Sequence, residues 1–161
     1  MVEIYAYAAD CRLYGNVELG EGRLSDQLNS TEELNLRDAR LEDLADGHAV
    51  AMPRLTVAHE ELCAVIASGP RGDGARRLNT RTARVELEVG PYRVVGRVHG
   101  PPTGDPFASV LRRAAWLPLT EATVTYRLGG RDMSDAVATL LVNRHKMHSF
   151  RVADATSDRP L

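Results

Sequence analysis

Alternating apolar and polar residues run through most of the chain and predict short β-strands rather than helices. The segment 92–98 is the clearest case, because Val94, Gly96 and Val98 alternate with Arg93, Val95 and Arg97. A period of two places successive side chains on opposite faces of a strand. Such patterns predict strands at 2–8, 11–19, 34–43, 48–57 and 62–67 in the first half of the chain, and at 82–89, 92–99, 117–127, 136–142 and 147–152 in the second.

Turn residues separate the predicted strands. Gly90-Pro91 cannot continue a strand ladder, because proline has no backbone N–H to donate. Asp46-Gly47 and Gly129-Gly130 are typical of two-residue hairpin loops, which need a positive φ. We therefore expect the chain to fold largely as a series of hairpins.

One segment in each half has the period of a helix. In "GDPFASVLRRAA", Asp105 suits an N-cap, Pro106 suits the first helical position, and the apolar residues that follow share one helical face. The first half has a weaker counterpart, in which Leu24 and Leu28 lie four residues apart. The sequence thus predicts one short helix per half.

The two halves align with each other. "CRLYGNV" aligns with "YRVVGRV" at an offset of 81 residues, and "LNLRDARL" aligns with "LPLTEATV" at an offset of 83. The segment from Leu55 to Ala67 aligns with the segment from Leu140 to Val152 at an offset of 85. Apolar positions keep their order throughout, which indicates an internal duplication.

We therefore expect a mainly β protein with short helices, an α+β fold made by tandem duplication of a small five-stranded, barrel-like unit with one short helix. A unit of about 65 residues buries only ~60% of its unfolded surface, so we expect the two units to pack together as a pseudo-twofold pair. The predicted boundaries are 1–68 for the first β-rich repeat, 69–81 for a Gly/Arg linker, 82–154 for the second repeat and 155–161 for a flexible tail.

Composition changes this picture little. The apolar fraction is 43% and the charged fraction 26%, both ordinary for a soluble globular protein. We see no apolar run of the ~20 residues that span a bilayer and no signal peptide, so we expect a cytoplasmic protein that does not bind membranes. Cys11 and Cys63 are then expected to be buried thiols, with a disulfide between them as the less favoured alternative.

Charge is distributed unevenly along the chain. Residues 1–68 hold 13 acidic residues against 5 arginines, a net charge of −8, whereas residues 69–161 hold 9 against 15 basic residues, a net charge of +6. Oppositely charged halves suit each other, or a neighbouring molecule bound head to tail.

The stretch "GRLSDQLN…LNLRDARLED" resembles a bacterial family of unknown function that carries an R-L-[ST]-D-x-L-N turn before an F-x-x-L-x-D-A strand. The resemblance covers residues 11–66, and the second half only in outline. No activity is assigned to that family, so the resemblance implies none. The stretch is also loosely similar to Sm-like RNA-binding barrels, in which a D-x-x-x-N turn lies beside the RNA site. Here Asp26 and Asn29 resemble that turn, but a later Arg-Gly pair is missing, so this similarity implies only a small barrel-like shape.

The same stretch offers an acidic site near Asp26, Asn29, Asp38 and His59, of the kind that a small hydrolase or ligand-binding protein uses. The matching positions of the second half lack most of these acids. We therefore favour a structural role, in which Asp26 and Asn29 cap the short helix through bonds to the backbone.

Basic residues give a second candidate site, because the guanidinium group suits phosphates. The candidate binding residues are Arg76, Arg77, Arg93, Arg97, Arg112, Arg113, Arg144 and Lys146. They would make the second half and the linker a nucleic-acid-binding surface. Few aromatic residues and an acidic first half argue against this interpretation.

Catalytic and metal-binding motifs give little further support for an enzyme. His145 and His148 could hold a metal only if they shared a helical face, and no zinc-type spacing accompanies them. We expect no cofactor or metal. The sequence favours a non-enzymatic binding or assembly module that self-associates, as a homo-oligomer, or docks a protein partner through sheet edges and oppositely charged halves.

Overall fold

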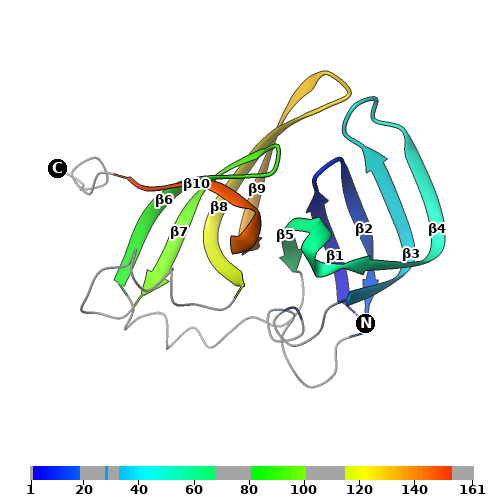
Figure 1. Ribbon diagram of the computed structural model, residues 1–161, viewed down its shortest axis with the longest axis horizontal. Helices are drawn as coiled ribbons and strands as arrows, with labels where there is room; N and C mark the ends of the chain where they lie inside the picture. Colours follow the sequence, from blue (N-terminus) through cyan, green and yellow to red (C-terminus); the bar gives the residue numbers. More distant parts are fainter. Residues whose placement is uncertain (1, 19–27, 29–32, 68–80, 101–114, 154–161) are drawn as a thin grey trace.

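The structure, a computed structural model, describes residues 2–18, 28, 33–67, 81–100 and 115–153, and these form one antiparallel sheet of ten strands (Figure 1). The strands are β1 (Val2–Ala8), β2 (Cys11–Val17), β3 (Glu33–Asp43), β4 (Ala49–Ala58), β5 (Leu62–Ala67), β6 (Arg81–Val89), β7 (Tyr92–Gly100), β8 (Trp116–Leu128), β9 (Arg131–Asn143) and β10 (Met147–Val152). Two 3-10 turns, η1 (His59–Glu61) and η2 (Arg144–Lys146), lead into β5 and β10. The strand order is β10-β6-β7-β8-β9-β5-β1-β2-β3-β4.

The predicted α+β class, with short helices and barrel-like units, is wrong. In the described part of the chain the elements are ten strands and two 3-10 turns, and the strands belong to one open sheet. Apart from Leu28, the helix-period segments lie outside the described residues, at 19–32 and 101–114. The sheet is continuous because β5 pairs with β9, which satisfies the backbone edge that each unit would otherwise expose. No helix in the described residues is long and apolar enough to span a membrane.

The strand order and the pairing registers repeat between β1–β5 and β6–β10. The order β5-β1-β2-β3-β4 recurs as β10-β6-β7-β8-β9. Val2 pairs with Val17 in the first half, and Ala83 pairs with Val98 in the second, 81 positions later for both strands. The registers of the other strand pairs recur in the same way, at an offset of 83 for β3 and β8 and of 85 for β4, β5 and their counterparts.

The halves meet head to tail. At their junction Ala64, Val65 and Ile66 of β5 lie opposite Val142, Leu141 and Leu140 of β9. In the repeated order β5 corresponds to β10, and β9 corresponds to β4. A two-fold axis would bring corresponding strands together. The pseudo-twofold prediction is therefore wrong.

Each half bends its sheet with the same bulge. Asp38 in β3 and Glu121 in β8 have positive φ angles of 51° and 48°, and in both places the register shifts opposite a glycine, Gly15 or Gly96. A Cβ added to Gly15 would lie 3.1 Å from the Cβ of Leu36, so a larger residue does not fit there without movement. Such bulges add twist and bend the strand that carries them.

This backbone geometry makes a prediction at Asp38, whose side chain is exposed. Glycine adopts a positive φ without the penalty of about 1 kcal/mol that a Cβ incurs. We expect Asp38→Gly to leave the protein more stable than Asp38→Ala by about 1 kcal/mol, measured as the difference in unfolding free energy in urea. Equal stability of the two variants would contradict the positive φ.

The cores of the two halves interpenetrate. Buried side chains form two clusters, and Tyr7, Cys63 and Ala64 of the first half belong to the cluster of the second. Conversely, Trp116 and Leu141 of the second half belong to the cluster of the first. Separating the halves would expose these side chains to water, which burial of apolar area opposes.

The predicted domain boundaries stay predictions, with one adjustment. The linker lies outside the described residues except at its last position, Arg81, which is already part of β6.

Candidate functional site

A polar cluster joins the two halves beside the β5–β9 junction. The hydroxyl groups of Tyr7 and Tyr126 both donate to Oδ2 of Asp135, at 2.7 and 2.6 Å. Arg12 donates from Nη1 to the hydroxyl oxygen of Tyr126 and from Nη2 to Oε2 of Glu42. Residues of β1, β2 and β3 are thereby connected to residues of β8 and β9.

Burial and hydrogen bonds set the protonation states of Tyr7, Tyr126 and Glu42 in this cluster. Burial, together with the hydrogen bond to Asp135, raises the pKa of Tyr7 and of Tyr126 far above the ordinary value. Burial is the largest influence on Glu42 and disfavours its ionised form. The hydrogen bond and positive charge of Arg12, together with a hydrogen bond from Tyr14 and the charge of Arg40, outweigh burial in sum and lower the pKa of that carboxyl group. The phenols therefore remain donors and Glu42 remains an anion at neutral pH. This arrangement suits a structural connection and leaves no general base among the phenols.

The lowered pKa of Glu42 predicts an acid-sensitive junction. A carboxyl group whose pKa is lower in the folded state adds stability above its unfolded pKa, and that stability is lost as the pH falls through the folded pKa. We expect the unfolding free energy to fall as the pH drops below the ordinary value of 4.5. Denaturant unfolding at several pH values below 4.5 should show that the unfolding free energy falls less steeply with pH for Glu42→Gln than for the wild type. An equally steep fall in both proteins would mean that Glu42 does not contribute to the acid sensitivity.

Further contacts cross between the halves near the hairpin tips. The hydroxyl group of Tyr92 donates to the carbonyl oxygen of Ala8 at 2.6 Å. The N–H of Gly129, in the β8–β9 turn, donates to the carbonyl oxygen of Leu44, beside the β3–β4 turn, at 2.8 Å. Figure 1 shows these two hairpins approaching each other. The junction is thus held by backbone as well as side-chain bonds.

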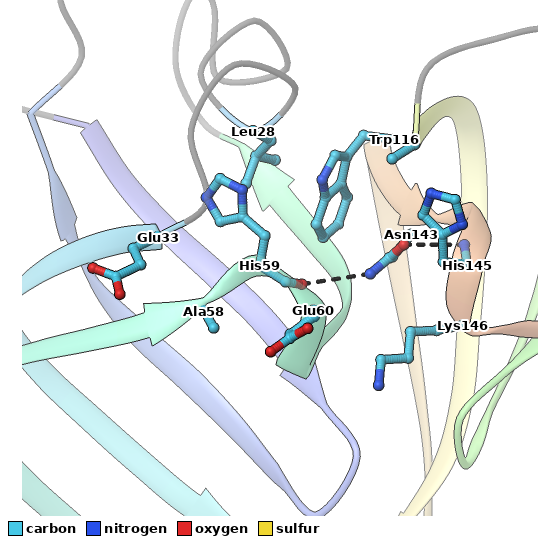
Figure 2. A pocket seen from close by; sticks show the side chains of 10 residues that line it. Leu28, Glu33, Ala58, His59, Glu60, Trp116, Asn143, His145 and Lys146 are labelled. Carbon is cyan, nitrogen blue, oxygen red and sulfur yellow. Dashed lines mark hydrogen bonds between the residues drawn. The ribbon is translucent and has the colours of Figure 1, made fainter.

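A hollow of about 620 Å³ lies along the junction and is lined by residues of both halves (Figure 2). Asn143, which is 4% exposed, donates from Nδ2 to the carbonyl oxygens of Leu62 at 3.0 Å and His59 at 3.4 Å. Its Oδ1 accepts the N–H of His145 at 3.1 Å. Each of these bonds goes to backbone, so Asn143 fixes the two 3-10 turns relative to each other.

The other side chains of the hollow do not assemble a recognisable reaction centre. The rings of His59 and Trp116 lie edge to face with centroids 6.3 Å apart. Glu60 comes from the first half and Lys146 from the second, and both are exposed. Among the described residues no group of three His, Cys, Asp or Glu side chains could hold a metal ion.

The structure does not bring the described members of the acidic site together. Asp26 and Asn29 lie outside the described residues. His59 is buried and follows Ala58, which pairs with Glu33. Asp38 is exposed five residues further along β3, a separation of roughly 16 Å at the usual rise per residue.

The basic candidates are distributed over separate elements. Arg76, Arg77, Arg112 and Arg113 lie outside the described residues, and Arg144 and Lys146 belong to η2. Arg93 and Arg97 lie on β7, and each has an acidic neighbour: Arg93 Nη2 is 3.7 Å from Oε2 of Glu86, and Arg97 Nε is 3.1 Å from Oε2 of Glu121. The described arginines of β7 therefore belong to a surface of mixed charge.

Both cysteines are free thiols. Burial raises the pKa of Cys63, and it raises that of Cys11 to about 12. Neither thiol is therefore ionised at neutral pH, as a nucleophilic cysteine would need to be.

Comparisons with known proteins give no relative. No protein-family model, no curated protein and no solved structure matches this chain. The resemblances to the bacterial family and to Sm-like barrels stay predictions. Geometry is therefore the ground for a functional proposal.

A further feature with binding capacity is the pair of sheet edges. In the described part of the chain β10 pairs only with β6, and β4 pairs only with β3. Val50 of β4 is 43% exposed and Val152 of β10 is 39% exposed. The sequence indicated sheet edges in general, but alternation within a strand does not show which strand will lie at an edge. Pro53 in β4 does not mark the edge by itself, because Pro118 lies in β8, which has β7 and β9 as neighbours.

Proposed function

We propose that the protein is a non-enzymatic assembly module that self-associates through the open edges of its sheet. The supporting observation is that β4 and β10 each have one strand neighbour among the described residues. An edge strand presents unpaired N–H and C=O groups, which readily pair with a strand of another chain.

The repeated registers support this proposal through an internal duplication. If the chain is a tandem repeat, β4 and β10 correspond to β9 and β5, the strands that pair with each other at the junction. Each open edge strand then resembles a strand that already pairs with the counterpart of the other edge strand inside the same molecule.

Charge favours association between unlike halves. The first half carries a net charge of −8 and the second a net charge of +6, and the two open edges lie one on each half. Complementary potentials speed encounter and disfavour contact between like surfaces.

The proposal predicts a concentration-dependent mass. Light scattering after size-exclusion chromatography should give a mass that rises above 17.6 kDa as the protein concentration increases, and falls toward 17.6 kDa when salt is added. The far-ultraviolet circular dichroism spectrum, recorded as a control, should stay constant with salt. A mass of 17.6 kDa at every concentration would contradict self-association.

The alternatives have less support. A nucleic-acid surface on β7 would need Arg93 and Arg97 free of the glutamates that lie beside them. A hydrolase or ligand site at the acidic turn would need Asp38 and His59 to converge, and they lie on separate parts of the first half.

A further inference from the structure

We propose that the partner of each open edge is a second copy of this chain, and that β10 of one copy pairs antiparallel with β4 of the next in the register of the β5–β9 junction. The inference rests on the proposed function and adds to it the partner, the strands and the residue pairs. The internal junction serves as its template.

The template specifies the pairs. The residues of β10 that correspond to Ala64, Val65 and Ile66 of β5, 85 positions later, are Ser149, Phe150 and Arg151. The residues of β4 that correspond to Val142, Leu141 and Leu140 of β9, 85 positions earlier, are Val57, Thr56 and Leu55. The expected intermolecular pairs are therefore Ser149 with Val57, Phe150 with Thr56, and Arg151 with Leu55.

The backbone of β10 is oriented for this pairing. The N–H of Ala153 donates to the carbonyl oxygen of Arg84 at 2.8 Å, so Ala153 directs its backbone groups toward β6. In an antiparallel ladder, alternate residues direct these groups to opposite sides of the strand. Phe150 and Val152 therefore direct theirs outward, to the open edge.

The backbone of β4 has the matching orientation. The N–H of Arg144, which directly follows β9, donates to the carbonyl oxygen of Ala115 at 2.7 Å, so by alternation Leu141 of β9 directs its backbone groups away from β8 and toward β5. Thr56 holds the corresponding place in β4. Phe150 and Thr56 would then exchange hydrogen bonds as Val65 and Leu141 do in the template.

Charge complementarity supports the same placement. At the internal junction Arg12 donates to the hydroxyl oxygen of Tyr126. The corresponding residues on the outer strands are Arg93 of β7, whose side chain is 62% exposed and lies 3.7 Å from Glu86, and Asp43 of β3, which is also exposed. The intermolecular contact therefore places an arginine against a carboxylate where the internal contact has an arginine against a phenol.

Pro53 does not obstruct this contact. It lies three residues before Thr56, so by the same alternation its nitrogen faces β3 and not an incoming strand. Since β10 and β4 are different strands, repetition of the contact generates a ring, or a filament if the rotation does not close.

A pair of substitutions at Thr56 tests the contact. Thr56→Pro removes the outward N–H while leaving the ladder to β3 intact, and Thr56→Ala is the matched control, because both lose the bond from Thr56 Oγ1 to Asn35. We expect Thr56→Pro to weaken association more than tenfold in sedimentation experiments, and Thr56→Ala to change it less than threefold. Equal association of folded Thr56→Pro and Thr56→Ala would overturn the inference.

Cysteine cross-linking tests the register independently of that variant. We would mix Leu55→Cys protein with Arg151→Cys protein, each also carrying Cys11→Ser, under oxidising conditions. Residues that flank a hydrogen-bonded pair have Cα atoms about 4.5 Å apart, within the range of a disulfide. We expect a disulfide-linked dimer from this mixture and none from the control, in which Ala51→Cys replaces Leu55→Cys.

The outcomes separate the two proposals. If the wild-type protein stays at 17.6 kDa, both the proposed function and this inference fail. If it assembles but Leu55→Cys and Arg151→Cys do not cross-link, the assembly function stands and the pairing of β10 with β4 is wrong.

Discussion

Replacing Gly90 with alanine is expected to destabilise the protein by about 3 kcal/mol, from a penalty of about 1 kcal/mol for the positive φ and about 2 kcal/mol for overpacking. Gly90 occupies the β6–β7 turn with a φ of 53°, and a Cβ there would lie 2.6 Å from Sγ of Cys63. Cys63 belongs to β5, in the other half of the molecule. The substitution therefore acts on the contact between the halves.

Gly47 provides a matched control for the backbone part of this effect. Its φ is 75°, and nothing lies within 4 Å of a Cβ added there. Gly47→Ala should cost only about 1 kcal/mol in urea unfolding. Adding Cys63→Ala to Gly90→Ala should recover part of the loss, since it removes the crowding sulfur. Equal losses for Gly90→Ala and Gly47→Ala would mean that the turn does not pack against β5.

Replacing Asp135 with alanine is expected to cost about 2–3 kcal/mol, because it leaves buried donors without an acceptor. Tyr7 and Tyr126 both donate to one oxygen of Asp135 and are themselves buried. Arg12 would also lose part of its compensating charge, since its Nη1 lies 3.9 Å from that oxygen.

Asp132 gives the control on the same strand. Its side chain is 92% exposed, and its Oδ1 lies 3.4 Å from Nε of Arg127. Exposed ion pairs contribute about 0–1 kcal/mol, so Asp132→Ala should be nearly neutral in the same unfolding measurement. If Asp135→Ala is equally mild, the polar cluster does not hold the halves together.

Local periodicity predicted the strands but not their assembly. The observed β7 (Tyr92–Gly100) and β10 (Met147–Val152) coincide almost fully with the predicted strands. Successive residues of a strand point to opposite faces, so neighbouring residues are enough to indicate a strand. The α+β class failed for a different reason. It gave structural weight to helix-period segments that, apart from Leu28, lie outside the described residues. Local patterns also gave no sign of the pairing of β5 with β9, which joins residues far apart in the chain.

The alignment between the two halves was more informative than any single motif. Asp38 and Glu121 were matched by the alignment at an offset of 83, and they are the two non-glycine residues with positive φ in the described part of the chain. The conformational preferences of Asp and Glu do not predict a positive φ at these positions. The structure shows it at two positions that the alignment matches. Conversely, the acidic residues of the first half suggested a site that includes Asp38 and His59. In the structure Asp38 is exposed on β3 and lies away from His59.

The junction residues were the least predictable. Asn143 was aligned with Ala58 and had no special signal, yet its amide bonds to two backbone carbonyls across the halves. Tyr7 and Asp135 are separated by 128 positions and meet only because the strand order places β9 near β1. Chemistry of this kind depends on tertiary pairing rather than on spacing in the sequence.

Analytical ultracentrifugation of the wild-type protein beside Thr56→Pro tests most directly whether open sheet edges make this chain an assembly module. The wild type should sediment as multiples of 17.6 kDa, while folded Thr56→Pro at the same concentration should sediment as a single chain. A wild-type protein that remains a single chain at every concentration, or a Thr56→Pro variant that assembles as the wild type does, would contradict that account.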